Sequence, residues 1–197
     1  ISDALGEELP RQLTSGGDTY KFGFEWSPDG KLIAWSDQHY SLYVTDVANR
    51  ITKKMITSEV NQIRDYSWSP DSKWLAFTEA GENKMGLIKL LNVDNGNIHT
   101  VTESWYFSEQ PSFSSDGKYL VFSSERSFNP VYGQTEWNHV YINMGKVYMI
   151  LLAADTPSPL APKNPLIEDK PASNGDNGKD NGSSSKDKNA KEKAELK

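Results

Sequence analysis

One short pattern occurs three times in the chain and constrains its fold more than any other feature. It begins with an aromatic residue, continues with Ser and a turn sequence, and ends in an apolar run. The copies are Trp26–Ser36, Trp68–Thr78 and Phe113–Ser123, and their serines are 42 and 45 residues apart. A period of about 40–45 residues that contains several short strands is typical of the blades of a β-propeller.

Each copy predicts a turn followed by a buried strand. In Ser27-Pro28-Asp29-Gly30, proline presets the backbone of the second position and glycine closes the turn, as in a type I turn. The apolar run that follows is rich in aromatic and branched residues, as a buried strand requires. Two further strands follow in each of the first two copies, and no segment shows a helical period. The sequence therefore predicts an all-β fold: a partial β-propeller of about three four-stranded antiparallel blades with a disordered C-terminal tail.

The copies also divide the chain into segments. Leu9–Thr14 is interpreted as the last strand of a preceding blade, and the absence of an initiator Met indicates an internal cut at the first residue. In the third copy a long insertion separates the second and third strands, and the proline-rich run 155–162 then ends the sheet, because proline cannot donate to a strand ladder. The predicted boundaries are 1–14 for that last strand, 15–58 and 59–103 for two blades, 104–163 for an incomplete blade with an insertion at 125–143, and 164–197 for a disordered polar linker.

Composition and charge exclude several classes of function. Residues 168–197 contain almost no apolar side chain, so this segment cannot bury enough surface to offset its ordering entropy. The net charge of −6 gives no support for nucleic-acid binding, which needs basic patches to meet the phosphates. The chain has no cysteine, which excludes thiol catalysis and cysteine-based metal sites. No run approaches the ~20 apolar residues of a membrane span.

The sequence contains no recognisable catalytic or metal-binding motif. A nucleophilic triad needs Ser or Cys with a positioned His and a carboxylate, but the chain has no Gly-x-Ser-x-Gly sequence and only three histidines. His39 is expected in a hairpin loop and His99 in an outer strand. Glu136 and His139 lie three residues apart in the insertion, and two ligands are too few for a metal site. We therefore predict no catalytic residue, no metal site and no cofactor.

The insertion 125–143 is the best candidate for a binding site. Long insertions without a strand pattern are either functional or disordered, and the aromatic content of this one argues against disorder. The alternative is a loop that packs on its own propeller. The candidate peptide-binding residues are Arg126, Phe128, Asn129, Tyr132 and Trp137.

The tryptophans inside the repeat have a different interpretation. Aromatic side chains at fixed positions of a blade pack between blades. We expect this packing for Trp26, Trp35, Trp68 and Trp74.

The repeat resembles that of a known group of propellers. Ser27–Lys31, Ser-Pro-Asp-Gly-Lys, is similar to the repeats of tricorn protease, TolB and prolyl oligopeptidase relatives. The third copy is more specific, because its segments 124–132, 134–139, 144–148 and 155–163 look like the last blade and exit of the first propeller of tricorn-like peptidases. The resemblance covers residues 9 to about 167. It implies the N-terminal, six-bladed propeller portion of a self-compartmentalising serine peptidase that also has a seven-bladed propeller, a PDZ-like domain and a catalytic domain.

This resemblance implies a non-catalytic fragment that gates or guides peptides to a catalytic domain not present in the chain. The implied partners are peptides or unfolded polypeptide, the remaining blades and catalytic domains of the parent chain, and further copies in a hexamer, with no nucleic acid and no membrane span. The implied location is cytoplasmic; the cell envelope or periplasm is the alternative, because the N-terminus is missing. The alternative function is a TolB-like protein-binding propeller with no hydrolase attached.

Overall fold

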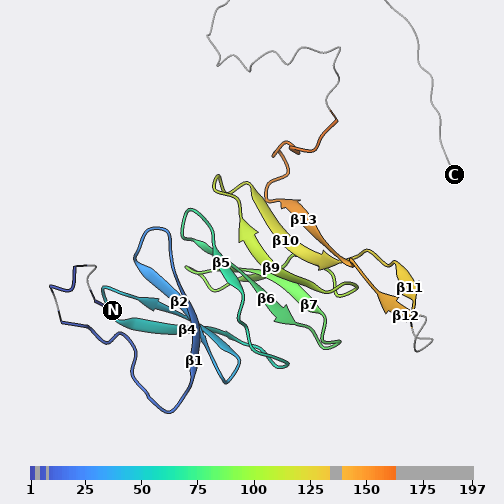
Figure 1. Cartoon of the computed structure of the whole chain (residues 1–197). Coiled ribbons are helices and arrows are strands. Elements are labelled where there is room, and N and C mark those ends of the chain that lie inside the picture. Colours follow the sequence, from blue (N-terminus) through green and yellow to red (C-terminus); the bar gives the residue numbers. More distant parts are fainter. Residues whose placement is uncertain (3–4, 8, 134–138, 163–197) are drawn as a thin grey trace, which may run out of the picture. The chain divides into compact units, whose positions relative to one another are not determined.

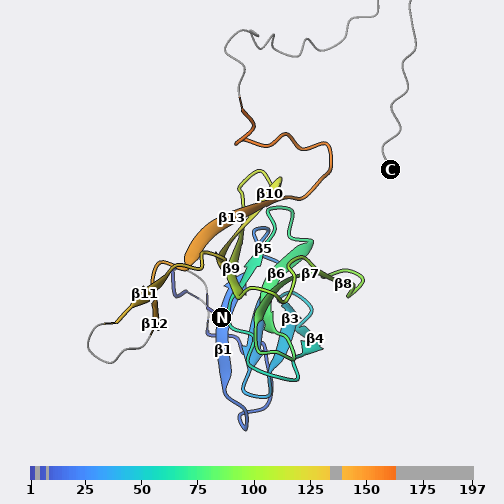
Figure 2. The same ribbon diagram turned by 90° about the vertical axis from the view of Figure 1, so that its right-hand side faces the viewer.

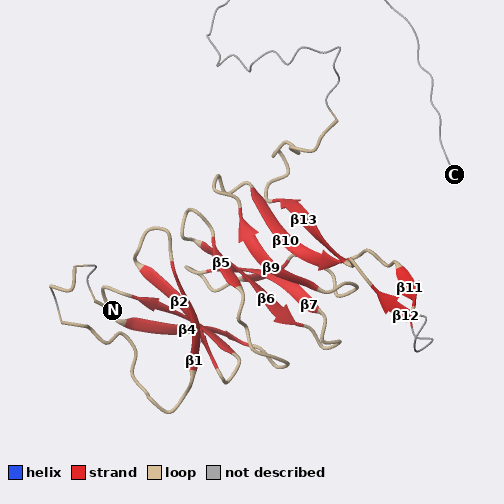
Figure 3. Ribbon diagram, viewed as in Figure 1, coloured by secondary structure: helices blue, strands red, loops and turns tan. Residues whose placement is uncertain are grey.

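The computed structural model describes residues 1–2, 5–7, 9–133 and 139–162 of the chain. The chain divides into two units, Ile1–Pro159 and Leu160–Lys197, and the described strands all lie in the first. The regular structure of the described residues consists of strands alone, as Figure 3 shows. These residues form no helix of the length and apolarity needed to cross a membrane.

Two four-stranded antiparallel sheets follow one another along the chain, each with its strands in sequence order (Figure 1). Blade 1 contains β1 (Lys21–Trp26), β2 (Leu32–Asp37), β3 (Ser41–Asp46) and β4 (Ile51–Thr57). Blade 2 contains β5 (Tyr66–Trp68), β6 (Trp74–Ala80), β7 (Gly86–Asn92) and β8 (Ile98–Thr100).

The third sheet has three strands in the order β13-β10-β9. Blade 3 thus contains β9 (Ser108–Phe113), β10 (Tyr119–Glu125) and β13 (Gly145–Leu151), and a separate two-stranded hairpin, β11 (Pro130–Tyr132) and β12 (His139–Tyr141), lies between β10 and β13 in the sequence. These sheets confirm the predicted all-β partial propeller.

The repeated turn is held by the same hydrogen bonds in all three blades. In blade 1 the Ser27 hydroxyl donates to Asp29 Oδ1 at 2.6 Å and accepts from the backbone N–H of Leu32 at 2.9 Å. Asp29 Oδ1 also accepts from the N–H of Lys31 at 3.1 Å. The hydrogen bond from Ser27 lowers the pKa of Asp29. The equivalent bonds are made by Ser69, Asp71, Lys73 and Trp74 in blade 2 and by Ser114, Asp116, Lys118 and Tyr119 in blade 3.

The fourth position of each turn has a left-handed backbone, which explains why the sequence favours glycine there. φ is 70° at Gly30 and 69° at Gly117, conformations that glycine adopts without steric cost. Blade 2 has Ser72 instead, with φ of 60°. Its hydroxyl accepts a hydrogen bond from the backbone N–H of Asp29 at 3.1 Å, so the serine joins the turns of blades 1 and 2.

Two apolar cores lie between successive blades. Figure 2 shows the ribbons of the blades from a second direction. The first joins blades 1 and 2 and includes Ala34, Leu42, Val44, Trp68, Leu75 and Phe77. The second joins blades 2 and 3 and includes Ala76, Ile88, Leu120 and Phe122. Because Leu75 and Phe77 face one core while Ala76 faces the other, β6 is buried on both sides, as a blade between two neighbours must be.

Hydrogen bonds also cross from blade to blade near β1, β5 and β9. The Tyr66 hydroxyl donates to the carbonyl oxygen of Gly23 at 2.7 Å, where β1 bulges and φ is 40°. The N–H of Gln110, at an irregularity of β9, donates to Asp65 Oδ2 at 2.7 Å. Gly23 and Gln110 stand at the same position of the repeat relative to the turn serines, Ser27 and Ser114. Blades 1 and 3 therefore each carry a bulge at this position, and each bulge is hydrogen-bonded to blade 2.

Leu9–Thr14 is not paired as a strand with any described residue; the N–H of Arg11 donates to the carbonyl of Ile1 at 2.6 Å. Its assignment to a preceding blade stays a prediction. One expectation, on the tryptophans, holds only in part. Packing between blades holds for Trp68, which is 6% exposed and donates to the carbonyl of Glu25 at 3.2 Å. It does not hold for Trp26, which is 46% exposed because no described blade covers that side of β1.

Candidate peptide-contacting site

The insertion leaves blade 3 and returns to it at one point. β10 and β13 pair along their whole length, from Tyr119 opposite Leu151 to Glu125 opposite Gly145, so the two ends of the insertion lie together. Between them, β11 and β12 pair with Val131 opposite Val140. The insertion therefore contains a short hairpin, which we name the insertion hairpin (Phe128–Tyr132 with His139–Ile142), where the sequence indicated a loop without strands.

The insertion hairpin exposes a cluster of large apolar side chains. Phe128 is 72% exposed, and its ring lies 4.9 Å from that of Tyr141, centroid to centroid. Figures 1 and 2 both show β11 and β12 projecting away from the three sheets. The other exposed members are Val131, Tyr132, Val140 and Ile142. Contiguous exposed apolar side chains are a common feature of interaction surfaces, so the hairpin is a candidate for one.

Arg126 lies at the base of the hairpin and contacts the aromatic side chains of blade 3. Its guanidinium carbon is 4.6 Å from the ring centroid of Tyr148 and 5.5 Å from that of Tyr106. Its Nε donates to the hydroxyl of Ser124 at 3.0 Å. These cation–π and hydrogen-bond contacts hold Arg126 against the sheet, and they separate it from the exposed rings of the hairpin.

The remaining predicted site residues are distributed as follows. Asn129 is exposed next to β11, and Phe128 and Tyr132 lie on the hairpin itself. Trp137, together with Glu136, lies outside the described residues. The structure thus brings Phe128, Asn129 and Tyr132 into one neighbourhood and places Arg126 at its base, while peptide binding by these residues stays a prediction.

The three histidines lie in separate parts of the fold. His39 lies in the loop between β2 and β3 and His99 in β8, and neither side chain is hydrogen-bonded to a serine. Within the described ranges no three His, Asp or Glu side chains come together as a metal site would require.

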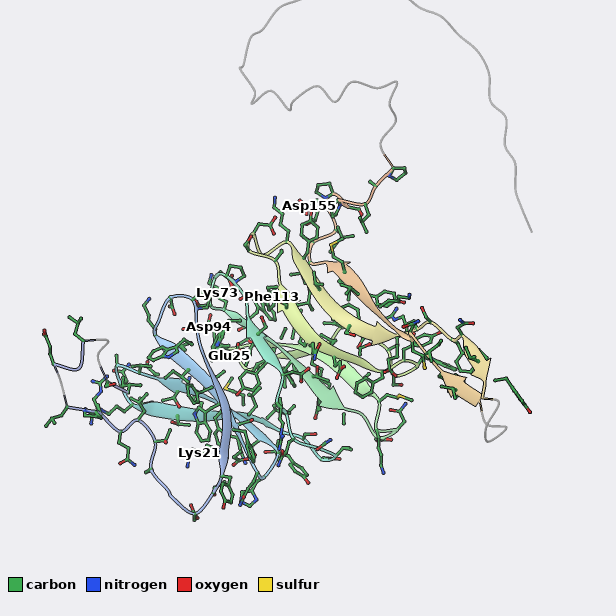
Figure 4. All side chains as sticks on the ribbon, in the orientation of Figure 1. Lys21, Glu25, Lys73, Asp94, Phe113 and Asp155 are labelled. Carbon is green, nitrogen blue, oxygen red and sulfur yellow. The ribbon has the colours of Figure 1, made fainter. Side chains whose placement is uncertain are left out.

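Sequence reasoning missed one recess of the surface. A groove of about 440 Å³ lies between blades 2 and 3, and its walls include Trp74, His99 and Phe113. Figure 4 labels Phe113 of blade 3 and Lys73 of blade 2 among the side chains. The groove could not be found from the sequence, because these residues come from separate strands of two blades.

The fold and the described residues define a β-propeller whose blades share one turn motif. Comparison with protein families agrees: the family model of the tricorn protease second beta propeller domain matches residues 3–196. The chain belongs to this family. The sequence resemblance to tricorn-like propellers is therefore confirmed, with one correction: the family is described as the second propeller, whereas the resemblance pointed to the first, six-bladed one.

Curated relatives extend well beyond this chain. Tricorn protease homolog 1 of Streptomyces coelicolor is 31% identical over 137 residues, which are 70% of this chain and 13% of the relative. Tricorn protease of Thermoplasma volcanium is 26% identical over 165 residues, 81% of this chain and 16% of the relative. The chain thus spans a small fraction of the length of these relatives.

Solved structures share the fold. The crystal structure of the tricorn protease matches with a TM-score of 0.66 at 21% identity, over 71% of this chain and 14% of that one. A putative TolB from Agrobacterium tumefaciens matches with a TM-score of 0.52 at 22% identity, over 75% of this chain and 50% of that one. At these identities the likeness concerns the fold alone.

Proposed function

We propose that this chain is a non-catalytic propeller segment of a tricorn-like serine peptidase, which gates or guides peptides to a catalytic domain outside the chain. The observation that carries the proposal is the insertion hairpin, because it presents exposed aromatic and branched side chains on a rigid base within a tricorn-family propeller. The cytoplasmic location and the hexamer that the resemblance implies belong to the same proposal.

The insertion hairpin offers two features that can bind an extended peptide: strand edges and exposed aromatic side chains. A two-stranded ribbon leaves backbone N–H and C=O groups on its outer edges, to which an extended peptide can add as a further strand. Its aromatic side chains supply large contact areas at low entropy cost. Because β10 and β13 hold both ends of the insertion, the hairpin is positioned by blade 3.

The alternative is a TolB-like protein-binding propeller with no hydrolase attached. Its support is the shared fold with TolB structures. The sequence of the parent protein beyond Lys197 distinguishes the two: a further propeller, a PDZ-like domain and a catalytic serine favour the peptidase, and their absence favours the TolB-like protein.

The proposed function is tested by substituting an exposed ring of the hairpin in the full-length protease. Phe128→Ala should impair turnover of long peptides more than that of dipeptide-sized ones, because only long chains need guidance. The 197-residue chain by itself should leave both kinds of peptide intact in a fluorogenic assay. Cleavage that persists through purification and is lost with one Ser or His substitution would contradict a non-catalytic role.

A further inference from the structure

The lining of the groove between blades 2 and 3 combines aromatic and apolar side chains with two acidic ones. Trp74 and Phe113 are half-buried in it, and the ring of His99 lies 6.0 Å from that of Trp74. Asp71 and Asp116, from the repeated turns of the two blades, stand at its edge. The turns are direct neighbours, since a Cβ on Gly117 would lie 3.7 Å from Pro70 Cδ.

Both carboxylates carry their charge at neutral pH. Hydrogen bonds from Ser69 and Ser114 hold the pKa of Asp71 and of Asp116 below the ordinary value. The lysines of the same turns do not line the groove; Lys118 Nζ is 4.0 Å from Asp116 Oδ2 and is mostly exposed. Among the described residues, no lysine or arginine lines this groove. The two carboxylates therefore border a groove whose described lining holds no lysine or arginine, although Lys118 lies near Asp116 outside it.

The equivalent groove between blades 1 and 2 shows what such a site accommodates. It measures about 290 Å³, and Lys53 lies in its lining with Asp46 and Asp94. The pKa of Asp46 is lowered first by hydrogen bonds from Asn49 and also by the charge of Lys53. In that groove the lining includes a lysine beside acidic side chains. The corresponding repeat position of the groove between blades 2 and 3 is His99, since Lys53 pairs with Val44 and His99 with Leu90.

We propose that the groove between blades 2 and 3 binds the arginine side chain of an extended peptide. A guanidinium is flat, so it can stack on Trp74, and its five N–H donors can serve Asp71 and Asp116 together. Apolar neighbours of the arginine would cover Phe113. This binding is independent of the proposed gating function, because it uses a different surface and needs no catalytic domain.

The probes are three short peptides that differ in one side chain. Acetyl-Leu-Arg-Leu-amide is compared with its citrulline and lysine counterparts by calorimetry on the 197-residue chain, while NMR follows the indole N–H signals. The citrulline peptide keeps the shape of arginine without its charge, so we expect it to bind about tenfold more weakly. The lysine peptide should bind about threefold more weakly, because it stacks less well. Raising the salt concentration should weaken arginine binding.

A matched pair of variants locates the site. Asp116→Asn removes one carboxylate of the groove and should weaken arginine binding about threefold to fivefold. Asp29→Asn makes the same change in the same turn of blade 1, outside this groove, and should leave binding unchanged. Thermal melts confirm that both variants fold. Equal binding of arginine and citrulline peptides, equal effects of the two variants, or no saturable binding to the folded chain would each overturn the proposal.

Discussion

A methyl group added at Gly86 tests whether blades 2 and 3 pack as closely as the structure shows. Gly86 begins β7, and a Cβ there would lie 2.4 Å from the carbonyl oxygen of Ser108 in β9. An ordinary contact needs about 3.4 Å, so the two blades would have to separate locally by roughly 1 Å. Ser108 cannot easily retreat, because it is fully buried and its hydroxyl bonds to that of Ser124 at 3.0 Å.

The expected cost of Gly86→Ala follows from two opposing terms. Overpacking of this kind destabilises by about 1–3 kcal/mol, and the loss of glycine freedom in the unfolded chain returns about 0.4–1 kcal/mol. We expect a net loss of about 1–2 kcal/mol in the free energy of unfolding. For a domain of this size that lowers the melting temperature by roughly 2–8 °C.

The control is Gly145→Ala at the start of β13. The nearest atom to a Cβ there is Ser123 Oγ at 3.9 Å, an ordinary contact, and φ is not in the left-handed region. This variant should be neutral or slightly stabilising. Melting curves by circular dichroism measure both. If Gly86→Ala melts at the same temperature as Gly145→Ala, blades 2 and 3 are not in the contact described.

Two further predictions concern the hydrogen bonds of the blades. Tyr66→Phe removes the hydrogen bond to the carbonyl of Gly23 and should lower the free energy of unfolding by about 1 kcal/mol in denaturant at neutral pH. Burial raises the pKa of Tyr66 to about 12, so the stability that is present below about pH 10 should be lost as pH rises toward 12. The variant should lose less stability over this range, because it lacks the phenol. Hydrogen bonds from the turn serines are the main cause that lowers the pKa of Asp29, Asp71 and Asp116. The three carboxylates therefore stabilise the folded chain fully above pH 3.8, their ordinary pKa, and this stabilisation is lost as pH falls through their lower pKa values in the folded chain. The melting temperature should therefore fall below pH 4, and the triple Asp→Asn variant should lose less over the same range; an identical pH profile would contradict this explanation.

The blades could be predicted from the sequence because each is specified locally. Ser27 and Asp29 make their turn within five residues, and the strands that follow pair with their neighbours in sequence order. The insertion hairpin was missed because β11 and β12 have three residues each, too few to show an alternating pattern. The exposure of Phe128 could not be predicted either, since aromatic content does not tell a packed loop from a projecting one.

The contacts that join two blades could not be predicted from the sequence. The groove unites Trp74, His99 and Phe113 from three strands of two blades, and only their registers bring them together. The bond from Gln110 to Asp65 likewise spans 45 residues. A repeat predicts that blades pack, but the side chains that meet depend on the bulges and twist of each sheet.

The most direct measurement of the central claim is the ratio of kcat/KM for long and for dipeptide-sized substrates in the tricorn-like peptidase that we propose as the parent protein. If the insertion hairpin guides peptides, Phe128→Ala should lower this ratio about threefold or more, while Tyr20→Ala, which removes an exposed ring far from the hairpin in sequence, should not change it. Both variants should melt like the wild type, because the two rings are largely exposed. An equal effect of Phe128→Ala on long and short substrates, or an equal effect of the two variants on the ratio, would contradict a guiding role.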